Sequence, residues 1–485
     1  MKLYEIIENL KFIGIKSYKE LEIDALTCDS KEKVENGIYF CLKGLNSDGH
    51  KYAEEAIKNG CICLVVEKFL EVDITQILVD DARVTMSYIS SIFYETYKSK
   101  MKFIGVTGTN GKTTSTFLIR DILSSLGKKV GLIGTQGVFI NSLELPATLT
   151  TPDPIVLHKT IKDMENNFCE YCVMEVSAHA IALNKIDNIY FDTVALTNIT
   201  KDHLDFFLTM ENYSKCKASL FDVKHAKSGA INVDTREGKE IAKRASIEIM
   251  SFGKNAELSM VKQNKTMSGS EIVIQYKNIT HDIKTNLIGE YNLYNLMTAI
   301  SCLINVGIDI KDIIGVINEK EFFIPGRFNV MSVDNGVKVI IDYAHTPDGI
   351  KNILSAINAL PKNNLITVFG CGGNRDKTKR HEMGEVAVNL SDNVIVTSDN
   401  PRDENPDMII DDIVSNLEIK DYTRITDRRQ AIEYALSIAK ENDIIAILGK
   451  GAESYQEIKG IKFHYSDFEV VENYCHNISK GELKA

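Results

Sequence analysis

The sequence predicts an α/β protein with three domains, the central one built on a mostly parallel sheet. Short apolar runs alternate with helical patterns along almost the whole chain, which is typical of helices covering a parallel sheet. The chain has 485 residues, more than one ordinary hydrophobic core requires. The alternation also restarts twice, near Met101 and after Pro325. We therefore expect domains at residues 1–98, 99–328 and 329–485.

The first domain is expected to be a small mixed α/β unit. Apolar runs at 37–41 and 61–66 predict strands, and the pattern over 52–59 predicts a helix between them. Cys61, Cys63, Cys169 and Cys172 form the only close pairs among the ten cysteines. Together they could make a zinc site, but no histidine or polar turn adjoins them. Buried, reduced thiols are therefore the favoured interpretation.

The second domain opens with a strand at 103–106, a glycine- and threonine-rich turn, and a helix that ends at Gly127. Further strands are expected at 130–133, 171–176 and 193–197. The polar stretch near 250–285 alternates in short segments and predicts an antiparallel extension of the sheet.

The third domain repeats the alternation of a Rossmann-like fold. Its expected strands lie at 337–341, 365–369, 393–397 and 444–448, and each runs into a polar or glycine-rich turn. Ligands of such parallel sheets bind at the carboxyl ends of the strands. We therefore look for functional residues in those turns.

The composition excludes several classes of protein. With 44% hydrophobic and 25% charged residues it is that of an ordinary globular protein. No apolar run approaches the roughly 18–20 residues of a membrane span, and the first ten residues lack the apolar core of a signal peptide. A net charge of −11 argues against non-specific binding to nucleic acid. We expect a cytoplasmic monomer with neither membrane nor nucleic-acid partners.

The turn after the strand at 103–106 has the chemistry of a phosphate loop. Glycines let backbone N–H groups close around phosphate oxygens, and the following helix adds the positive end of its dipole. Lys112 would reach the terminal phosphates, and the Thr113 hydroxyl would bind Mg²⁺. Val106 stands where the usual Gly-x₄-Gly-Lys pattern has its first glycine. ATP, or alternatively GTP, is the expected ligand, and the loop consists of Gly108, Thr109, Asn110, Gly111, Lys112, Thr113 and Thr114.

Three further polar segments follow in the same domain. Glu175 stands where a strand ends, His203 follows the next strand, and Lys215 and Lys217 lie on a predicted helix. A site that transfers a phosphoryl group needs Mg²⁺ ligands beyond the loop threonine, and a carboxylate and an imidazole are suitable types. Each residue alone could equally be a surface turn residue; their order behind a phosphate loop favours a shared site.

The segments TGTNGKTT, EVSAHA, TNITKDHLD, YSKCKASLF, PGRF, DYAHTPD, CGGNRD, DNPR and GKGAE follow one another across nearly the whole chain. In this combination the sequence resembles the Mur ligase family, and within it the MurE type, the UDP-N-acetylmuramoyl-tripeptide synthetases. CDSK at 28–31 and DGH at 48–50 match the UDP-binding domain of that type. The resemblance implies a central P-loop-type domain between an N-terminal UDP-binding domain and a Rossmann-like C-terminal domain.

The resemblance also implies the reaction. ATP phosphorylates the glutamate carboxylate of UDP-MurNAc-L-Ala-D-Glu, and the amine of a diamino acid displaces phosphate to form a peptide bond. Phosphate turns the oxygen of an unreactive carboxylate into a good leaving group. The expected product belongs to cytoplasmic peptidoglycan precursor synthesis, and thus to cell-wall biogenesis, cell shape and cell division. The implied cofactors are ATP and Mg²⁺, with CO₂ for carbamylation of a lysine.

Carried over motif by motif, the resemblance implies roles for individual residues. Lys112, Glu175, His203 and Lys217 would be catalytic, with Lys217 as N6-carboxylysine. Thr113, Glu175, His203 and Lys217 would bind Mg²⁺. Outside the loop, the residues expected to bind the nucleotide are Asn292, Asn295, Arg327, Asp342 and His345. The residues expected to bind UDP-MurNAc-dipeptide are Ser30, Thr150, Thr151, Ser177 and Lys185. The residues expected to bind the amino acid are Arg375, Asp399, Asn400, Arg402, Gly449 and Glu453. Without the resemblance, Lys217 would be interpreted as a solvated helical lysine.

DNPR at 399–402 is the variant associated with meso-diaminopimelate, whose distal carboxylate an arginine fork can recognise. Departures from the family pattern leave L-lysine or another amino acid as the alternative. Two further candidate functions are a folylpolyglutamate-synthetase-like ligase and a non-catalytic nucleotide-binding regulator. The departures are Lys31 and Lys185 for arginines, Ala178 for a serine, Phe207 and Leu208 for His-Gly, Asn374 for an aspartate, His381 for a proline and Ala452 for a histidine.

Overall fold

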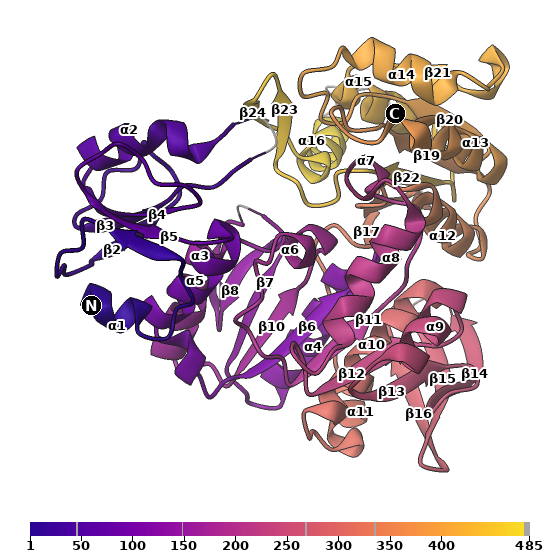
Figure 1. The fold of residues 1–485 in the computed structure, drawn as a ribbon. Helices are drawn as coiled ribbons and strands as arrows, with labels where there is room; N and C mark the ends of the chain where they lie inside the picture. Colours follow the sequence, from indigo (N-terminus) through magenta and orange to yellow (C-terminus); the bar gives the residue numbers. More distant parts are fainter. Residues whose placement is uncertain (45–46, 148, 267–268, 334–335, 480–485) are drawn as a thin grey trace.

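The computed structural model describes residues 1–44, 47–147, 149–266, 269–333 and 336–479. Figure 1 shows three α/β parts, with the central part below and the two others above it on opposite sides. Three sheets of five, eleven and six strands form the three parts, together with a separate two-stranded hairpin. The predicted α/β fold class is therefore confirmed. In the part of the chain that the structure describes, no helix combines the length and the apolar character of a membrane span.

The N-terminal sheet has the order β1-β5-β4-β3-β2. Its neighbours are parallel except for β1, which runs antiparallel to β5. The strands expected at 37–41 and 61–66 are confirmed as β3 and β4, and the helix between them as α2. The elements are α1 (Leu3–Ile7), β1 (Gly14–Lys16), β2 (Ala25–Thr27), β3 (Gly37–Phe40), α2 (Ala53–Lys58), β4 (Cys61–Val66), β5 (Thr75–Leu78) and α3 (Ala82–Phe93).

The parallel strands of the central sheet run in the order β13-β12-β11-β6-β10-β7. β6 lies in the middle, between β10 and β11, so the loops that leave these three strands meet at one edge. The strands are β6 (Lys102–Thr107), β7 (Val130–Gly134), β10 (Tyr171–Glu175), β11 (Thr193–Leu196), β12 (Ser228–Asn232) and β13 (Glu248–Gly253). The strands predicted at 103–106, 130–133, 171–176 and 193–197 are thereby confirmed.

Antiparallel strands extend this sheet at both ends. They are β8 (Gly137–Ile140) and β9 (Leu143–Leu145) beside β7, and β14 (Leu258–Thr266), β15 (Gly269–Tyr276) and β16 (Ile279–Thr285) beyond β13. The prediction of an antiparallel extension near 250–285 is right for β15 and β16, but wrong for its beginning. β13 pairs in parallel with β12, and β14 starts in parallel with β13. The crossover through α9 (Arg236–Arg244) returns the chain in the direction of β12.

Helices cover both faces of the central sheet. α4 (Lys112–Ser125) and α10 (Glu290–Asn305) pack on one face, where Phe117, Ile300 and Leu303 share a core with Val106. α5 (Pro154–Asn166) covers the other face through Leu157 and Ile161. The remaining helices of this part are α6 (Ala178–Ala182), α7 (Leu204–Phe207), α8 (Met210–Ala218) and α11 (Ile310–Glu319).

The C-terminal sheet has the order β17-β18-β22-β19-β20-β21 and is parallel except for β17. All four strands predicted here are confirmed. The strands are β17 (Asn329–Ser332), β18 (Lys338–Asp342), β19 (Leu365–Phe369), β20 (Asn393–Val396), β21 (Thr423–Arg424) and β22 (Ile444–Leu448), with the hairpin β23 (Tyr455–Ile458) and β24 (Ile461–His464). The helices are α12 (Pro347–Asn358), α13 (Arg380–Leu390), α14 (Pro406–Val414), α15 (Arg428–Ile438) and α16 (Asp467–Ser479).

Candidate active site

The loop between β6 and α4 leaves no room for side chains at its two glycines. Gly108 has φ +148° and Gly111 has φ +89°, in the region that favours glycine. A Cβ on Gly108 would overlap the Thr197 hydroxyl, and one on Gly111 would overlap the Asn295 amide oxygen. Thr197, the residue after β11, and Asn295 of α10 therefore lie directly against the loop backbone, and the glycines are required there.

Residues that follow β11 hold the loop by hydrogen bonds. The Asn110 N–H donates to Asn198 Oδ1 at 3.0 Å, and the Thr197 hydroxyl donates to the Asn110 carbonyl at 2.6 Å. Thr109 Oγ1 lies 3.1 Å from the Tyr213 hydroxyl, which comes from α8. The loop conformation is thus fixed by the neighbouring strand and by the helix that carries Lys217.

Two cationic side chains converge at the start of α4. Lys112 Nζ donates to the carbonyls of Gly108 (3.0 Å) and Thr109 (2.8 Å). Arg327 reaches in from the segment that leads to β17, and its Nη2 donates to Thr113 Oγ1 at 3.1 Å. Burial lowers the pKa of Lys112, and the charge of Arg327 acts in the same direction. Among the described residues the buried Arg327 Nε has no hydrogen-bond partner.

These features fit a polyphosphate. A glycine-rich turn at the N-terminus of a 14-residue helix is a favourable position for an anion. Phosphate oxygens would relieve the repulsion between the two cations and supply a partner for the free Arg327 N–H. Other residues predicted to bind the nucleotide also lie near this loop. α10 carries Asn292 and Asn295. Asp342 accepts hydrogen bonds from the N–H groups of Phe328 and Ala344, and these bonds shape the loop around Arg327. The structure places His345 three residues beyond β18, where its Nδ1 lies 2.8 Å from the Tyr343 carbonyl.

Glu175 is the last residue of β10, and His203 lies in the loop that connects β11 to α7. Glu175 is 1% exposed and accepts hydrogen bonds from the Thr135 N–H (2.9 Å) and hydroxyl (3.2 Å). His203 precedes α7 in the left-handed region, with φ +55°. Burial lowers the pKa of His203 to about 4, with nearby Lys112 and Lys217 acting in the same direction. The imidazole is therefore neutral near pH 7, which is the form that binds a metal.

Lys217 is one of the most deeply buried charged residues, with 1% exposure. Its Nζ donates to the Gly108 carbonyl at 2.9 Å and lies 4.8 Å from the centroid of the Tyr213 ring. Burial and, next, the charge of Lys112 hold its pKa well below the usual value for lysine. Lys215 instead points to solvent and pairs with Glu211. Lys217 therefore belongs to the phosphate-loop side of α8, and Lys215 does not.

Glu175, His203 and Lys217 do not form a ready-made metal cluster. Among the described residues no group of three or more histidine, cysteine, aspartate or glutamate side chains is arranged to hold a metal ion. A Mg²⁺ site here would need other oxygen ligands, such as the Thr113 hydroxyl, a carbamate on Lys217, phosphate oxygens and water. The four cysteines considered for zinc are Cys61, Cys63, Cys169 and Cys172. All four are buried and free, which is consistent with reduced thiols.

Most residues predicted for the muramyl dipeptide lie beside Glu175. The Thr151 hydroxyl donates to the Glu175 carbonyl at 2.8 Å and also lies 3.3 Å from Ser177 Oγ. Thr150 Oγ1 lies 3.0 Å from Thr135 Oγ1. Lys185 Nζ pairs with Asp153 at 2.8 Å. Ser30 lies in the N-terminal part, where its hydroxyl donates to Glu55.

The residues predicted for the amino acid form two connected groups in the C-terminal part. Asn400 donates to Glu453 at 2.8 Å and accepts from Lys450 at 3.0 Å. Asp399 lies against Gly449, where a Cβ would come 2.6 Å from its carboxylate. Arg375 lies in the turn after β19, near enough to lower the pKa of His179 together with burial, which is the larger cause.

Arg402 forms the second group. It adopts φ +52° and is held on both sides of its backbone, since its N–H donates to the Glu457 carbonyl and its carbonyl accepts from Lys459. Its Nε donates to Glu457 Oε2 at 3.1 Å and its Nη1 to the Gly373 carbonyl at 2.7 Å. The strand β23 therefore fixes the direction of the guanidinium.

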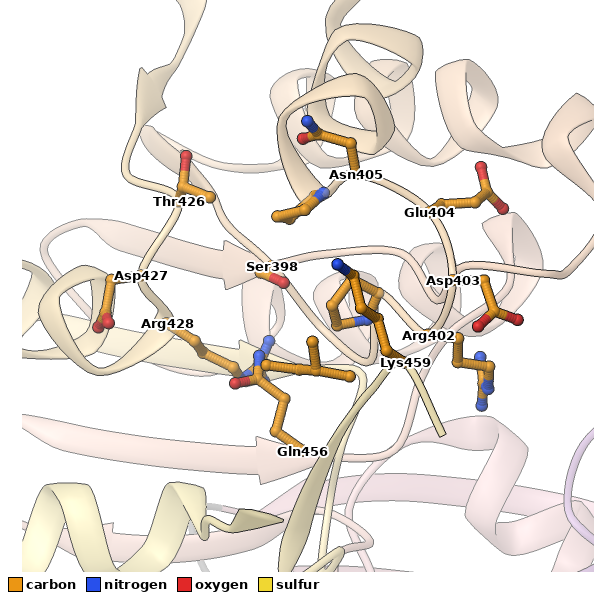
Figure 2. A pocket seen from close by; sticks show the side chains of 13 residues that line it. Ser398, Arg402, Asp403, Glu404, Asn405, Thr426, Asp427, Arg428, Gln456 and Lys459 are labelled. Atoms are coloured by element: carbon orange, nitrogen blue, oxygen red, sulfur yellow. The ribbon is translucent and has the colours of Figure 1, made fainter. Parts of the chain in front are cut away.

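A cavity of about 630 Å³ opens beside the DNPR loop. Figure 2 shows Arg402 and Asp403 on one side of it, and Thr426 and Asp427 on the other. Of the six residues predicted for the amino acid, only Arg402 lines this cavity. The cavity lies at the carboxyl ends of β20 and β21, the edge where parallel sheets bind ligands.

Several residues of the site were missed by sequence reasoning. Thr135 binds Glu175, and Lys450 is completely buried between Asn400 and Glu453. Glu457 orients Arg402, and Asp202 lies beside His203. Asp202 and Lys450 stand inside motifs that the sequence displays, so they could have been proposed. Thr135 and Glu457 carry no signal of their own, because only the tertiary contacts select them.

The central parallel sheet, the glycine-rich loop and the buried lysines together are the features of a phosphate-loop protein with three α/β parts. The profile of the Mur ligase middle domain matches residues 106–303, and that of the Mur ligase glutamate ligase domain matches residues 326–451. The UDP-N-acetylmuramoyl-L-alanyl-D-glutamate–2,6-diaminopimelate ligase 1 of Clostridium acetobutylicum is 39% identical over 99% of this chain and 100% of its own length. The ligase of that activity from Aquifex aeolicus is 41% identical over 93% of both chains. The chain therefore belongs to the Mur ligase family, in its MurE branch, and is an amide-forming ligase.

Solved structures of Mur ligases have the same fold as this chain. A structure of a UDP-N-acetylmuramoyl-L-alanyl-D-glutamate–2,6-diaminopimelate ligase superimposes with a TM-score of 0.67 and 28% identity, covering 94% of this chain and 95% of that one. The MurF ligase of Thermotoga maritima in complex with ADP shares the fold, with a TM-score of 0.65, 18% identity and coverage of 95% and 98%. The folylpolyglutamate synthase of Mycobacterium tuberculosis also shares it, with a TM-score of 0.64 and 16% identity, but covers only 76% of this chain and 91% of its own.

Proposed function

We propose that this ligase uses ATP to join meso-diaminopimelate to the glutamate carboxylate of UDP-MurNAc-L-Ala-D-Glu. The observation that carries the proposal is the agreement of two findings. Relatives with this activity in their names match the chain over nearly its whole length at about 40% identity. The residues predicted for the nucleotide side also converge on the Gly108 carbonyl and Thr113. The place of action would be the cytoplasm, and the working form a monomer.

On this proposal, Lys112 and Arg327 bind the terminal phosphates of ATP. Their charges would counter the negative charge that grows as the γ-phosphoryl group moves to the carboxylate. The acyl phosphate would then accept the amine of the incoming amino acid, and phosphate would leave. When bound, Mg²⁺ neutralises phosphate charge, and Thr113, Glu175, His203 and Lys217 are the residues that would hold it.

Lys217 is proposed to act as a carbamate. Its neutral amine attacks CO₂, a carbon–nitrogen bond forms, and one proton leaves to water. The low pKa of Lys217 supports the first step, because only the neutral amine is a nucleophile. Lys112 lies close by, since both lysines donate to the Gly108 carbonyl, and its positive charge disfavours a positive charge on Lys217. A carbamate would place a negative charge beside the Lys112 ammonium, which is an attractive arrangement, and would offer the hard oxygen ligands that Mg²⁺ prefers.

The choice of diaminopimelate rests on Arg402. Glu457 and Gly373 engage its Nε and Nη1, and among the described residues its Nη2 has no hydrogen-bond partner. That amino group would bind the distal carboxylate of diaminopimelate, which lysine lacks. Asn374, which replaces the family aspartate, donates to Asp403 at 2.6 Å and thereby braces the same loop.

One experiment tests the proposed reaction against the competing functions. Purified protein is incubated with ATP, Mg²⁺ and UDP-MurNAc-L-Ala-D-Glu, with a panel of amino acids, and both ADP and the product mass are measured. We expect ADP and a product with meso-diaminopimelate, and at least tenfold less with L-lysine. A preference for L-lysine would reassign the amino acid. Nucleotide binding without ADP release would indicate a regulator, and activity only with folate substrates a folylpolyglutamate synthetase.

A further inference from the structure

A short turn of the C-terminal part contacts the loop that carries His203. The 3₁₀ helix η5 (Lys377–Lys379) leads directly into α13. Lys379 Nζ lies 3.6 Å from Asp202 Oδ1, and both side chains are largely buried, with 11% and 9% exposure. Asp202 adjoins His203, and its Oδ1 also accepts the His203 backbone N–H at 3.0 Å. Lys379 therefore contacts the carboxylate that caps the backbone of His203.

The same turn also holds the loop that carries Arg402. Arg380 is 1% exposed and donates to both oxygens of Glu404, at 2.9 and 3.0 Å. It also donates to the Gly372 carbonyl at 3.3 Å and to Asp412 at 2.8 Å. Lys377 adds a third contact to Glu404 at 3.0 Å. Two adjacent residues, Lys379 and Arg380, thus link the His203 loop to the loop of Arg402.

A second ion pair crosses between the same two segments but differs in its surroundings. Lys201 pairs with Glu382 at 2.5 Å, and both side chains are more than a third exposed. Exposed pairs contribute little to stability, because water screens them and ordering two long side chains costs entropy. A partly desolvated pair is screened much less. Of the two contacts, Lys379–Asp202 is the one able to fix the relative position of the segments.

We propose that Lys379 is a positioning residue that, through Asp202, fixes the position of the His203 loop relative to the Arg402 loop. In this way it would place the incoming amine against the activated carboxylate. This inference rests on the proposed ligase reaction. Lys379 is not among the residues proposed to bind ATP or the amino acid. Its loss would slow the joining step rather than weaken the binding of nucleotide, which depends on Lys112, Arg327 and the loop backbone.

The test compares Lys379→Met, Lys379→Arg and the control Glu382→Gln in the full-length enzyme. Product formation is measured with all three substrates, and kcat and each KM are determined. We expect Lys379→Met to lower kcat at least tenfold while the KM for ATP changes less than threefold. Lys379→Arg should recover most of the loss, because it keeps the charge. Glu382→Gln should stay within twofold of the parent. A Lys379→Met enzyme within twofold of the parent would overturn the inference.

A double-variant comparison tests whether Lys379 acts through Asp202. If it does, Lys379→Met combined with Asp202→Asn should be no more than threefold slower than the slower single variant; losses that multiply would refute the link. Lys379→Gln replaces the methionine variant if that protein does not fold, as judged by thermal unfolding. An inactive parent enzyme would instead count against the proposed function, so the two failures are distinguishable.

Discussion

At the scale of single residues, burial sets the charge of Lys112 and Lys217, the two lysines beside the phosphate loop. Lys112 and Lys217 approach the same carbonyl, from the start of α4 and from the last turn of α8. Removal from water disfavours the charged form of each and lowers both pKa values, and the charge of Lys112 lowers the pKa of Lys217 further. Lys112 can recover its charge by binding phosphate. Lys217 contacts a hydroxyl and a carbonyl, and the proposed carbamate would give it the negative charge that a neighbouring Lys112 favours.

Lys217→Ala is therefore expected to lower kcat by at least a hundredfold, because an anionic ligand is lost. Lys215→Ala is the matched control from the same helix and should stay within twofold, since Lys215 is exposed and pairs only with Glu211. Steady-state rates of ADP release measure both. Small carboxylates added to the alanine variant should restore part of the rate by filling the vacated space. Mass spectrometry of the parent should show one added CO₂ on Lys217; an active enzyme with an unmodified lysine would contradict this.

Arg402→Ala is expected to remove the preference for diaminopimelate. A charged hydrogen bond left unpaired in a buried site costs roughly 2–5 kcal/mol, so kcat/KM for diaminopimelate should fall at least tenfold. The rate with L-lysine, which we expect to be low in the parent, should change less than threefold, because lysine has no distal carboxylate. Competition between the two amino acids, followed by product mass, measures the effect. An equal loss with both substrates would show that Arg402 supports the loop rather than recognises the carboxylate.

At the scale of elements, α4 shows how one helix serves both the core and the site. Its apolar side packs on the sheet and on α10, while its N-terminus faces the phosphate loop. Glycines stand at both of its ends with positive φ, +89° at Gly111 and +76° at Gly127. Their surroundings differ. A Cβ at Gly111 would overlap the Asn295 amide, whereas nothing lies within 4 Å of one at Gly127.

The two glycines make a matched pair of alanine substitutions. Gly127→Ala should cost only the backbone strain of the left-handed region, about 1–2 kcal/mol in the free energy of unfolding, and should leave nucleotide affinity unchanged. Gly111→Ala adds an overlap with Asn295 and moves the loop, so we expect at least tenfold weaker binding of ATP. Denaturant unfolding and titration with a fluorescent ATP analogue measure the two effects. Equal nucleotide affinities in the two variants would contradict the role of Asn295.

At the scale of the whole molecule, contacts between the parts of the chain matter as much as the separate cores. His158 of α5 is completely buried, and its Nδ1 lies 2.6 Å from Thr96 Oγ1, in the segment between α3 and β6. Burial lowers the pKa of His158 to about 3. In the unfolded chain the same group has a pKa near 6.5, so the unfolded state binds more protons between these two pH values.

Stability is therefore expected to fall as the pH drops below about 6.5, by up to ~1.4 kcal/mol per pH unit from this histidine alone. His158→Gln should be less stable than the parent at pH 7, since a well-packed ring is lost. Between pH 7 and 5, however, the variant should lose about 2 kcal/mol less than the parent. Urea unfolding at pH 7, 6 and 5 measures both slopes. Parallel slopes would show that His158 already takes up its proton in the folded protein.

The sequence alone determined the three-part α/β fold, the phosphate loop and the membership in a ligase family. Each follows from local patterns: apolar runs for strands, glycines next to a helix start, and ordered motifs. Among the predicted strands, the start of the antiparallel extension was wrong, because the direction of β13 depends on which neighbour it joins.

The tertiary structure decided what local patterns do not contain. Lys215 and Lys217 are two residues apart on one helix, yet only Lys217 enters the core beneath the phosphate loop. Glu457 and Lys379 belong to no motif that the sequence displays, and they matter because Arg402 and Asp202 lie against them. Burial and charge pairing depend on segments that meet only in the folded chain, and these two quantities set the ionisation and the orientation of the side chains at the site.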